Sequence, residues 1–228
     1  MTTPRTARLL AALHRFNAAH PWDHNAHYHP WLLRQLPRRF GTALDVGCGS
    51  GELARLLAGR AMEVHALDSD AEILARARDS TPATAPVVYR LADARRQLPD
   101  GPYDVITCVA ALHHLPLAET LTRLKDRLAP GGALVVVGCA RASGPLDHAL
   151  GLAAVPLNPL MGWAKNRGRP SPRRPASMTA PTRAPRETYA DISRTARRVL
   201  PGTRPRRRLF WRYTLVWRAP VAGARRSG

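Results

Sequence analysis

The stretch LDVGCGSGEL, residues 44–53, places three glycines between a segment of strand character and one of helical character. Gly47, Gly49 and Gly51 allow a tight turn and let a ligand approach the backbone, because no Cβ stands in the way. The spacing is GxGxG rather than the dinucleotide-binding GxGxxG, and Asp45 precedes the loop. A carboxylate at that point suits a ligand with an ammonium group better than one with phosphates.

Two further aspartates follow strand-like segments. Asp68 comes 17 residues after Gly51, where a carboxylate can accept hydrogen bonds from ribose hydroxyls. Asp93 ends the next strand-like segment and can accept from an adenine amino group. Each aspartate alone is as readily a turn former after a strand. In register with the glycine loop, the three carboxylates match the amino-acid, ribose and adenine parts of S-adenosylmethionine.

Two histidines, His113 and His114, follow the strand-like segment at 103–109. Methyl transfer from a sulfonium is an in-line displacement that depends on alignment, and it needs a base only when the acceptor is an alcohol, a phenol or a protonated amine. We predict that one of the pair, with His114 preferred, is a general base. The alternative is that the pair begins a helix and one imidazole hydrogen-bonds the backbone.

The stretch HPWDHNAHYHPW, residues 20–31, holds four of the nine histidines. We predict a short helix at about 21–28 and a second one that starts near Pro30. His24 and His27 would then share a face, while His29 points away. Three zinc ligands from this run would require the helix to break, so we expect no metal site.

These residues are positioned by an alternation of strand-like and helix-like segments, which argues for a parallel sheet with crossover helices. The predicted strands are 42–46, 62–68, 87–93, 103–109 and 133–139, and the predicted helices are 52–59, 71–78 and 117–128, the last stopped by Pro130-Gly131-Gly132. Beyond them we expect an apolar but broken segment at 141–168, a mobile loop at 169–186, a helix at 187–200 and a strand pair at 206–220.

The motifs LDVGCGSG, ALDSD, LADA and YDVITCVAALHHL, in this order and spacing, resemble those of class I S-adenosylmethionine-dependent methyltransferases of the small-molecule, ubiquinone- and menaquinone-biosynthesis type. The similarity covers residues 42–139. It implies an α/β, Rossmann-like three-layer sandwich around a mainly parallel seven-stranded sheet whose last strand is antiparallel. It also implies S-adenosylmethionine as cofactor, held by Asp45, Gly47, Cys48, Gly49, Gly51, Asp68, Ser69, Ile73, Asp93, Ala94 and Val109.

In the families that this chain resembles, the segment before the first strand often folds over the cofactor. The resemblance therefore implies one domain over 1–228, with a helical lid at 1–40 and a cofactor-binding core at 42–139. The segment 141–186 would be an insertion on the substrate side with a mobile loop, whose residues 141–165 form an apolar wall, and 187–220 would be the final helix and strand pair. The expected substrate contacts are Trp22, His24, His27, Tyr28, Trp31, Met161 and Trp163.

Composition limits the class of protein. The 228 residues suffice for one domain with a buried core. No apolar run approaches the roughly 20 residues that span a bilayer. Cys48, Cys108 and Cys139 form no CxxC pair that would indicate a zinc site or a disulfide framework. We expect a cytoplasmic protein without a membrane partner.

The formal charge of +19 is unevenly distributed. Residues 1–164 carry 17 Lys/Arg against 14 Asp/Glu, whereas residues 165–228 carry 18 against only Glu187 and Asp191. Such a basic segment can attract nucleic acid. Nearly all the cations are arginines beside abundant Ala and Pro, which is more typical of a GC-rich coding bias on solvated positions. Nucleic acid is therefore the lesser expectation.

The leading hypothesis is methyl transfer from S-adenosylmethionine to the oxygen or nitrogen of a small-molecule acceptor, such as a secondary metabolite. One alternative is an RNA or protein methyltransferase that uses the basic C-terminal third. Another is a non-catalytic methyltransferase-like binding protein. The sequence leaves the oligomeric state open.

Overall fold

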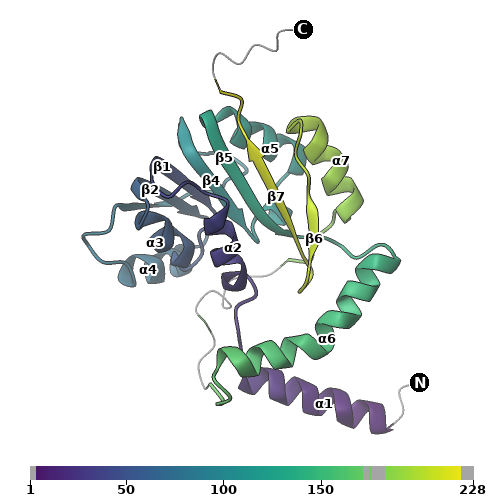
Figure 1. Cartoon of the computed structure of the whole chain (residues 1–228). Helices are drawn as coiled ribbons and strands as arrows, with labels where there is room; N and C mark the ends of the chain where they lie inside the picture. Colours follow the sequence, from purple (N-terminus) through teal and green to yellow (C-terminus); the bar gives the residue numbers. More distant parts are fainter. Residues whose placement is uncertain (1–3, 172–174, 176–182, 222–228) are drawn as a thin grey trace.

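The computed structural model describes residues 4–171, 175 and 183–221. Its centre is a seven-stranded sheet in the order β3-β2-β1-β4-β5-β7-β6 (Figure 1). The first five strands pair in parallel, and β7 is antiparallel to both of its neighbours. The fold predicted from the sequence is thereby confirmed. The strands are β1 (Phe40–Val46), β2 (Ala61–Asp68), β3 (Val87–Leu91), β4 (Tyr103–Val109), β5 (Leu128–Cys139), β6 (Arg206–Arg208) and β7 (Arg212–Arg218).

Helices cover both faces of the sheet and make it a three-layer structure (Figure 1). Successive strand residues point to opposite faces, so Leu44 packs with Leu121 and Ile192 on one side while Ala43 packs with Leu57 on the other. Both faces are apolar, as expected for a doubly covered parallel sheet. The covering helices are α5 (Leu117–Asp126) and α7 (Tyr189–Val199) on the first face, and α2 (His29–Arg34), α3 (Glu52–Ala58) and α4 (Ala71–Asp79) on the second.

Two long helices lie beside each other at one end of the molecule, away from the layered core (Figure 1). They are α1 (Pro4–Ala19) and α6 (Pro145–Lys165). The segment 141–168, predicted to be broken, is thus largely a continuous helix, although Pro156 and Pro159 each remove a backbone donor inside it. Packing overrides the two prolines, because Ala154 is buried and Gly162 lets the backbone of His20 approach closely.

Two other boundaries differ from the prediction. The helix expected at 21–28 is only a 3₁₀ turn at Ala26–Tyr28, preceded by residues without regular structure. The Pro130-Gly131-Gly132 stretch lies inside β5 rather than ending a helix, because α5 already ends at Asp126. There the pairing of β5 with β4 shifts register, and Gly131 supplies a φ of 78° that other residues rarely adopt.

Part of the loop predicted at 169–186, namely residues 172–174 and 176–182, lies outside the described residues. No helix in the described part of the chain is long and apolar enough to cross a membrane.

Candidate active site

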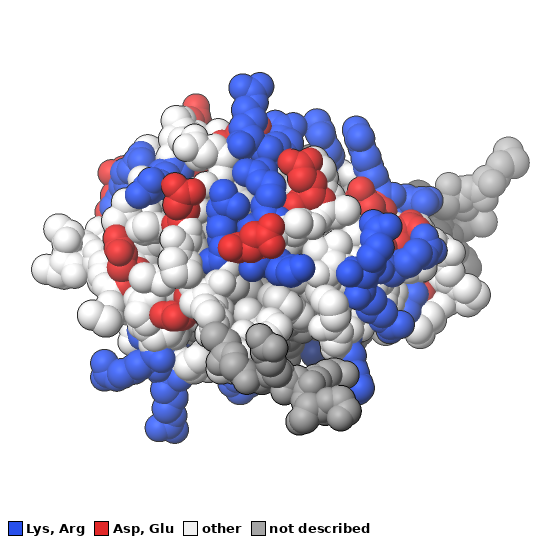
Figure 2. All heavy atoms as spheres, turned by 90° about the horizontal axis from the view of Figure 1, so that it is seen from above, with Lys and Arg blue, Asp and Glu red and all other residues white. Residues whose placement is uncertain are grey.

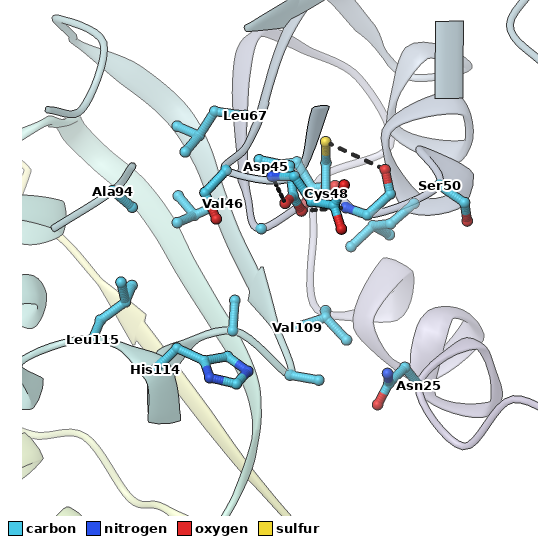
Figure 3. Close-up of a pocket in the computed structure, with 18 of the residues that line it drawn as sticks. Asn25, Asp45, Val46, Cys48, Ser50, Leu67, Ala94, Val109, His114 and Leu115 are labelled. Atoms are coloured by element: carbon cyan, nitrogen blue, oxygen red, sulfur yellow. Dashed lines mark hydrogen bonds between the residues drawn. The ribbon is translucent and has the colours of Figure 1, made fainter. Parts of the chain in front are cut away.

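A cavity of about 530 Å³ opens at the carboxyl ends of β1, β2 and β4 (Figure 3). Ligands of open parallel sheets bind at this edge, because loops from neighbouring strands converge there. Figure 3 shows His114 and Asn25 on opposite sides of Val109, with Asp45 and Cys48 across the cavity from them. The lining residues are Asp23, Asn25, His29, residues 45–50, Glu52, Leu53, residues 67–70, 92–95 and 109–111, His114, Leu115 and Arg183.

The glycine loop uses its three glycines in two ways. All three have positive φ, at 72°, 51° and 72° for Gly47, Gly49 and Gly51. A Cβ on Gly47 would overlap the side chain of Ala111, and one on Gly51 would overlap the Tyr89 hydroxyl. A Cβ on Gly49 would have only one atom within 4 Å. The outer glycines are therefore required by packing, and the middle one leaves room for a ligand.

Asp68 ties the second strand to this loop. Its carboxylate accepts a hydrogen bond from the Gly49 N–H at 2.8 Å and another from the Asp70 N–H at 3.0 Å. Each carboxylate oxygen retains a lone pair for a further donor. Asp68 also lines the cavity, so it can fix the loop and accept from ribose hydroxyls at the same time.

Asp45 is buried at the start of the loop with one oxygen satisfied. Its Oδ1 accepts from the Thr107 hydroxyl at 2.7 Å, whereas Oδ2 has no hydrogen-bond partner among the described residues. Burial raises the pKa of Asp45 to about 7. An ammonium group nearby would favour the ionised carboxylate. The unsatisfied oxygen and the open Gly49 thus fit the amino-acid end of S-adenosylmethionine.

Asp93 differs from the other two aspartates because it is already engaged. The Arg95 guanidinium binds both of its carboxylate oxygens, at 2.9–3.1 Å, and holds the pKa of Asp93 below its ordinary value. Asp93 and Ala94 line the cavity at the end of β3. An adenine amino group there would meet a carboxylate whose charge is shared with an arginine.

The remaining predicted cofactor residues fall into two groups. Cys48, Ser69 and Val109 line the cavity. Ile73 is buried behind the glycine loop, where its Cδ1 would lie 3.8 Å from a Cβ on Gly49. The structure therefore places every predicted cofactor residue except Gly51 and Ile73 in the cavity lining.

His114 lines the cavity and His113 does not, although their rings lie 4.0 Å apart. Burial lowers the pKa of both imidazoles, that of His113 to about 4, and Arg183 further lowers that of His114. Both side chains are therefore neutral near pH 7. The backbone of His114 closes a 3₁₀ turn through a bond to Ala111, so a local structural role coexists with exposure to the cavity.

The N-terminal segment reaches the cavity through residues other than those predicted. Trp22 and His24 turn toward α6, where the Trp22 indole N–H donates to the Asn158 side chain at 3.0 Å and His24 Nε2 lies 2.7 Å from the same oxygen. Neither of these two predicted substrate contacts is among the residues that line this cavity. The residues of this segment that do line the cavity are Asp23, Asn25 and His29.

The other predicted substrate contacts also lie outside the cavity lining. His27 meets Trp22 edge-on, and the Tyr28 hydroxyl donates to the Leu209 carbonyl at 2.7 Å. Trp31 lies under the Arg208 guanidinium. On α6, Met161 packs with Trp22, while Trp163 is exposed. The cause is the missing helix at 21–28: an irregular segment followed by a 3₁₀ turn presents different residues to the cavity than a regular helix would.

His29 is the least expected residue of the site. It is buried, its Nδ1 has no hydrogen-bond partner in the described part of the chain, and that atom lies 3.8 Å from a Glu52 carboxylate oxygen. Burial lowers the pKa of His29 and raises that of Glu52. No sequence pattern pointed to the His29–Glu52 pair, because the two residues meet only through tertiary packing. Arg95 and Arg183 were likewise not predicted, although Arg95 lies only two residues from Asp93.

The described residues contain no cluster of three or more His, Cys, Asp or Glu side chains that could hold a metal ion.

A family model described as a methyltransferase domain matches residues 44–136. An uncharacterized methyltransferase of Mycobacterium tuberculosis is 37% identical over 205 residues, which cover 88% of this chain and 98% of the relative. A trans-aconitate 2-methyltransferase of Streptomyces avermitilis is 37% identical over 121 residues, or 49% of this chain and 45% of that one. The solved magnesium protoporphyrin IX methyltransferase of Synechocystis with bound S-adenosylmethionine has a TM-score of 0.54 at 16% identity, covering 96% of this chain and 86% of that chain, and this similarity concerns the fold alone.

Proposed function

The chain belongs to the class I S-adenosylmethionine-dependent methyltransferases, and we propose that it transfers the methyl group to an oxygen or nitrogen atom of a small-molecule acceptor. The observation that carries this proposal is the single cavity lining in which Asp45 and Asp68 face Asn25, His29 and His114. Its volume of about 530 Å³ lies in the range of small-molecule sites. The cavity therefore has the size expected for a small-molecule acceptor beside the cofactor, and the proposal needs no groove for RNA or protein.

Bound S-adenosylmethionine supplies a methyl group on a sulfonium, whose departure needs little assistance. The protein's part is then to align the acceptor and to exclude water. Asp45, the Gly49 backbone and Asp68 would hold the cofactor, and the backbone near Val109 would approach its methionine end.

We assign the base role to His114, because it is neutral near pH 7 and faces the cavity. A neutral imidazole can accept the proton that an alcohol, phenol or protonated amine loses. The His113 ring packs against the His114 ring, 4.0 Å away, from outside the cavity lining. Asn25 is held from the far end of the chain by Arg212, whose guanidinium donates to Asn25 Oδ1 at 2.9 and 3.2 Å, and we propose that it orients the acceptor.

The trans-aconitate relative acts, by its name, on a small carboxylic acid, which supports the small-molecule class without naming the acceptor of this chain. The test is release of S-adenosylhomocysteine with three acceptor panels: carboxylic acids, phenols and primary amines. Turnover with members of one panel and not the others would support the proposal. Turnover only with RNA or protein substrates would refute it.

The nucleic-acid alternative draws on the basic C-terminal third. Several of its arginines are engaged within the protein: Arg207 pairs with Asp147 at 2.6 Å, and Arg212 binds Asn25. On the face seen in Figure 2, Lys and Arg side chains alternate with acidic ones. This surface favours the small-molecule proposal. RNA binding that falls steeply with salt would reverse that preference.

A further inference from the structure

The exposed face of α6 carries a stripe of large apolar side chains. Leu152, Val155, Leu160 and Trp163 are 75%, 43%, 56% and 49% exposed. At 3.6 residues per turn these four positions lie on one side of the helix. Contiguous exposed apolar surface of this kind marks an interaction site in a folded protein.

The opposite side of α6 is the one that packs against the protein. Ala154 is fully buried there, and Asn158 accepts the hydrogen bond from Trp22 and contacts His24. The helix therefore has an inner face used by the fold and an outer face that is uncovered in the described part of the chain. The stripe is an oriented feature rather than a scatter of surface leucines.

The chain around the stripe is basic, and the one acidic residue of α6, Asp147 in its first turn, is paired with Arg207 at 2.6 Å. We define the two-helix arm as residues 4–22 and 148–171, which include α1 and most of α6. Neither range contains an aspartate or a glutamate. The exposed cations of the arm are Arg8, Arg15, Lys165, Arg167 and Arg169.

We propose that the two-helix arm docks onto the surface of an anionic lipid bilayer. An apolar helix face flanked by cations lies in the plane of the interface, with leucines among the acyl chains and cations at the headgroups. Tryptophan favours the same depth, which suits Trp163 at the end of the stripe next to Lys165 and Arg167. Because α6 is not apolar enough to cross a membrane, it lies on the bilayer and does not span it.

Charge complementarity selects this occupant over the others. A second copy docking through the same face would bring two sets of cations together with no acidic residue to offset them. An RNA partner would use the cations but would leave the leucines and Trp163 unused. An anionic bilayer satisfies both the apolar stripe and the charges.

Hydrogen bonds link the two-helix arm to the segment that lines the cavity. Asn158 of α6 holds Trp22 and His24, and these residues flank Asp23 and precede Asn25, both of which line the cavity. Docking would therefore place this cavity wall at the bilayer surface. If the proposed function holds, this arrangement favours a lipophilic acceptor that partitions into the membrane. The binding test below does not depend on that function.

The experiment is co-sedimentation of the full chain with vesicles of phosphatidylcholine alone or of phosphatidylcholine and phosphatidylglycerol in equal parts, at low and high salt. We expect binding to the mixed vesicles, with a fraction that resists high salt because leucines are inserted. The double variant L152E/L160E should lose at least about tenfold in partitioning, since apolar burial is replaced by buried charge. The matched control M62E/V221E adds two glutamates at sites that are 82% and 65% exposed but lie off the arm, and it should bind like wild type at high salt.

Equal loss in both doubles, or complete release of wild type by salt, would show that only net charge attracts the protein and would overturn the proposal. Failure of wild type to sediment, with a dimer in solution that L152E/L160E dissociates, would assign the face to a second copy instead. Should L152E/L160E fold poorly by circular dichroism, an environment-sensitive dye on L152C replaces it. A blue shift with mixed vesicles at L152C but not at M62C supports docking, and no shift at either refutes it.

Discussion

The two sides of the cavity are built from contacts of different range. On the cofactor side, Asp68 holds Gly49, 19 residues away, and the glycine loop follows β1 directly. On the side that we assign to the acceptor, Trp22 bonds Asn158 across 136 residues, and Asn25 bonds Arg212 across 187. The cofactor side is therefore built within the α/β core, where the bond from Thr107 to Asp45 spans 62 residues. The wall that carries Asn25 forms only when both ends of the chain have packed together.

The largest expected effect lies on the acceptor side. His114→Ala should lower kcat by about 100-fold through loss of the base, while the affinity for S-adenosylmethionine changes little. The pair of measurements is single-turnover methyl transfer and calorimetric binding. His148→Ala removes an exposed histidine of α6 and serves as the control. An unchanged kcat in His114→Ala would leave the imidazole with only its local structural role.

Asp68→Ala should act on the cofactor side, with roughly 100-fold weaker binding of S-adenosylmethionine. The substitution removes the charged acceptor for the ribose, the hydrogen bond that holds the loop at Gly49 and the bond from the Asp70 N–H. Isothermal titration calorimetry measures the effect against Asp79→Ala, an exposed aspartate at the end of α4. Retained affinity in Asp68→Ala would contradict the assignment of the ribose site.

The glycine loop separates stability from binding. Gly51→Ala should cost roughly 3 kcal/mol of unfolding free energy, because it combines a left-handed backbone with an overlap on Tyr89. Gly49→Ala should cost about 1–2 kcal/mol of backbone strain and, in addition, weaken cofactor binding. Gly144→Ala, with no atom within 4 Å, should stay within about 0.5 kcal/mol. Urea unfolding compares the three, and equal losses in all of them would refute the division of roles.

The half-buried His113 is expected to make stability pH-dependent. Because folding lowers the pKa of His113 from 6.5 to about 4, the unfolded chain binds its proton first as the pH falls. The stabilisation is complete above pH 6.5 and is lost progressively toward pH 4. In His113→Asn, the loss of unfolding free energy between pH 6.5 and pH 4 should be smaller by about 1–2 kcal/mol, after allowance for partial solvent screening. An unchanged slope in unfolding titrations would show that His113 does not carry it.

The smallest effect is expected at Asp93. Because Arg95 already occupies its carboxylate, Asp93→Ala should weaken S-adenosylmethionine binding by about tenfold or less. Arg95→Ala should have the opposite effect and strengthen S-adenosylmethionine binding, because it frees the Asp93 carboxylate to accept from the adenine. Calorimetry measures both variants. A loss in Asp93→Ala as large as that in Asp68→Ala would remove the distinction between the two strand ends.

The difference in contact range explains what the sequence could predict. The strand and helix order from 42 to 139 and the glycine loop with its aspartates follow from periodicity and local spacing, and the structure has them close to the predicted bounds. Conversely, α6 was obscured by Pro156 and Pro159, whose local cost is outweighed by tertiary packing of Ala154 and Gly162.

The cavity wall from the N-terminal segment could not be predicted for the same reason. Assuming a regular helix at 21–28 assigned His24 and His27 to the acceptor, whereas the 3₁₀ turn directs Asn25 and His29 there. The position of Asn25 depends on Arg212, near the other end of the chain, and no local pattern encodes that contact. Sites built by long-range packing require the structure.

The most direct test of small-molecule methyl transfer in this cavity uses S-adenosylmethionine with a labelled methyl group. The enzyme is incubated with a lysate of the source cells, which is then split into small-molecule, RNA and protein pools, with Asp68→Ala as the parallel control. We predict label in the extractable small-molecule pool for the wild type and none for the variant. Label that is sensitive to ribonuclease or bound to protein would contradict the account. It would favour an RNA or protein methyltransferase that binds its substrate through the basic C-terminal third.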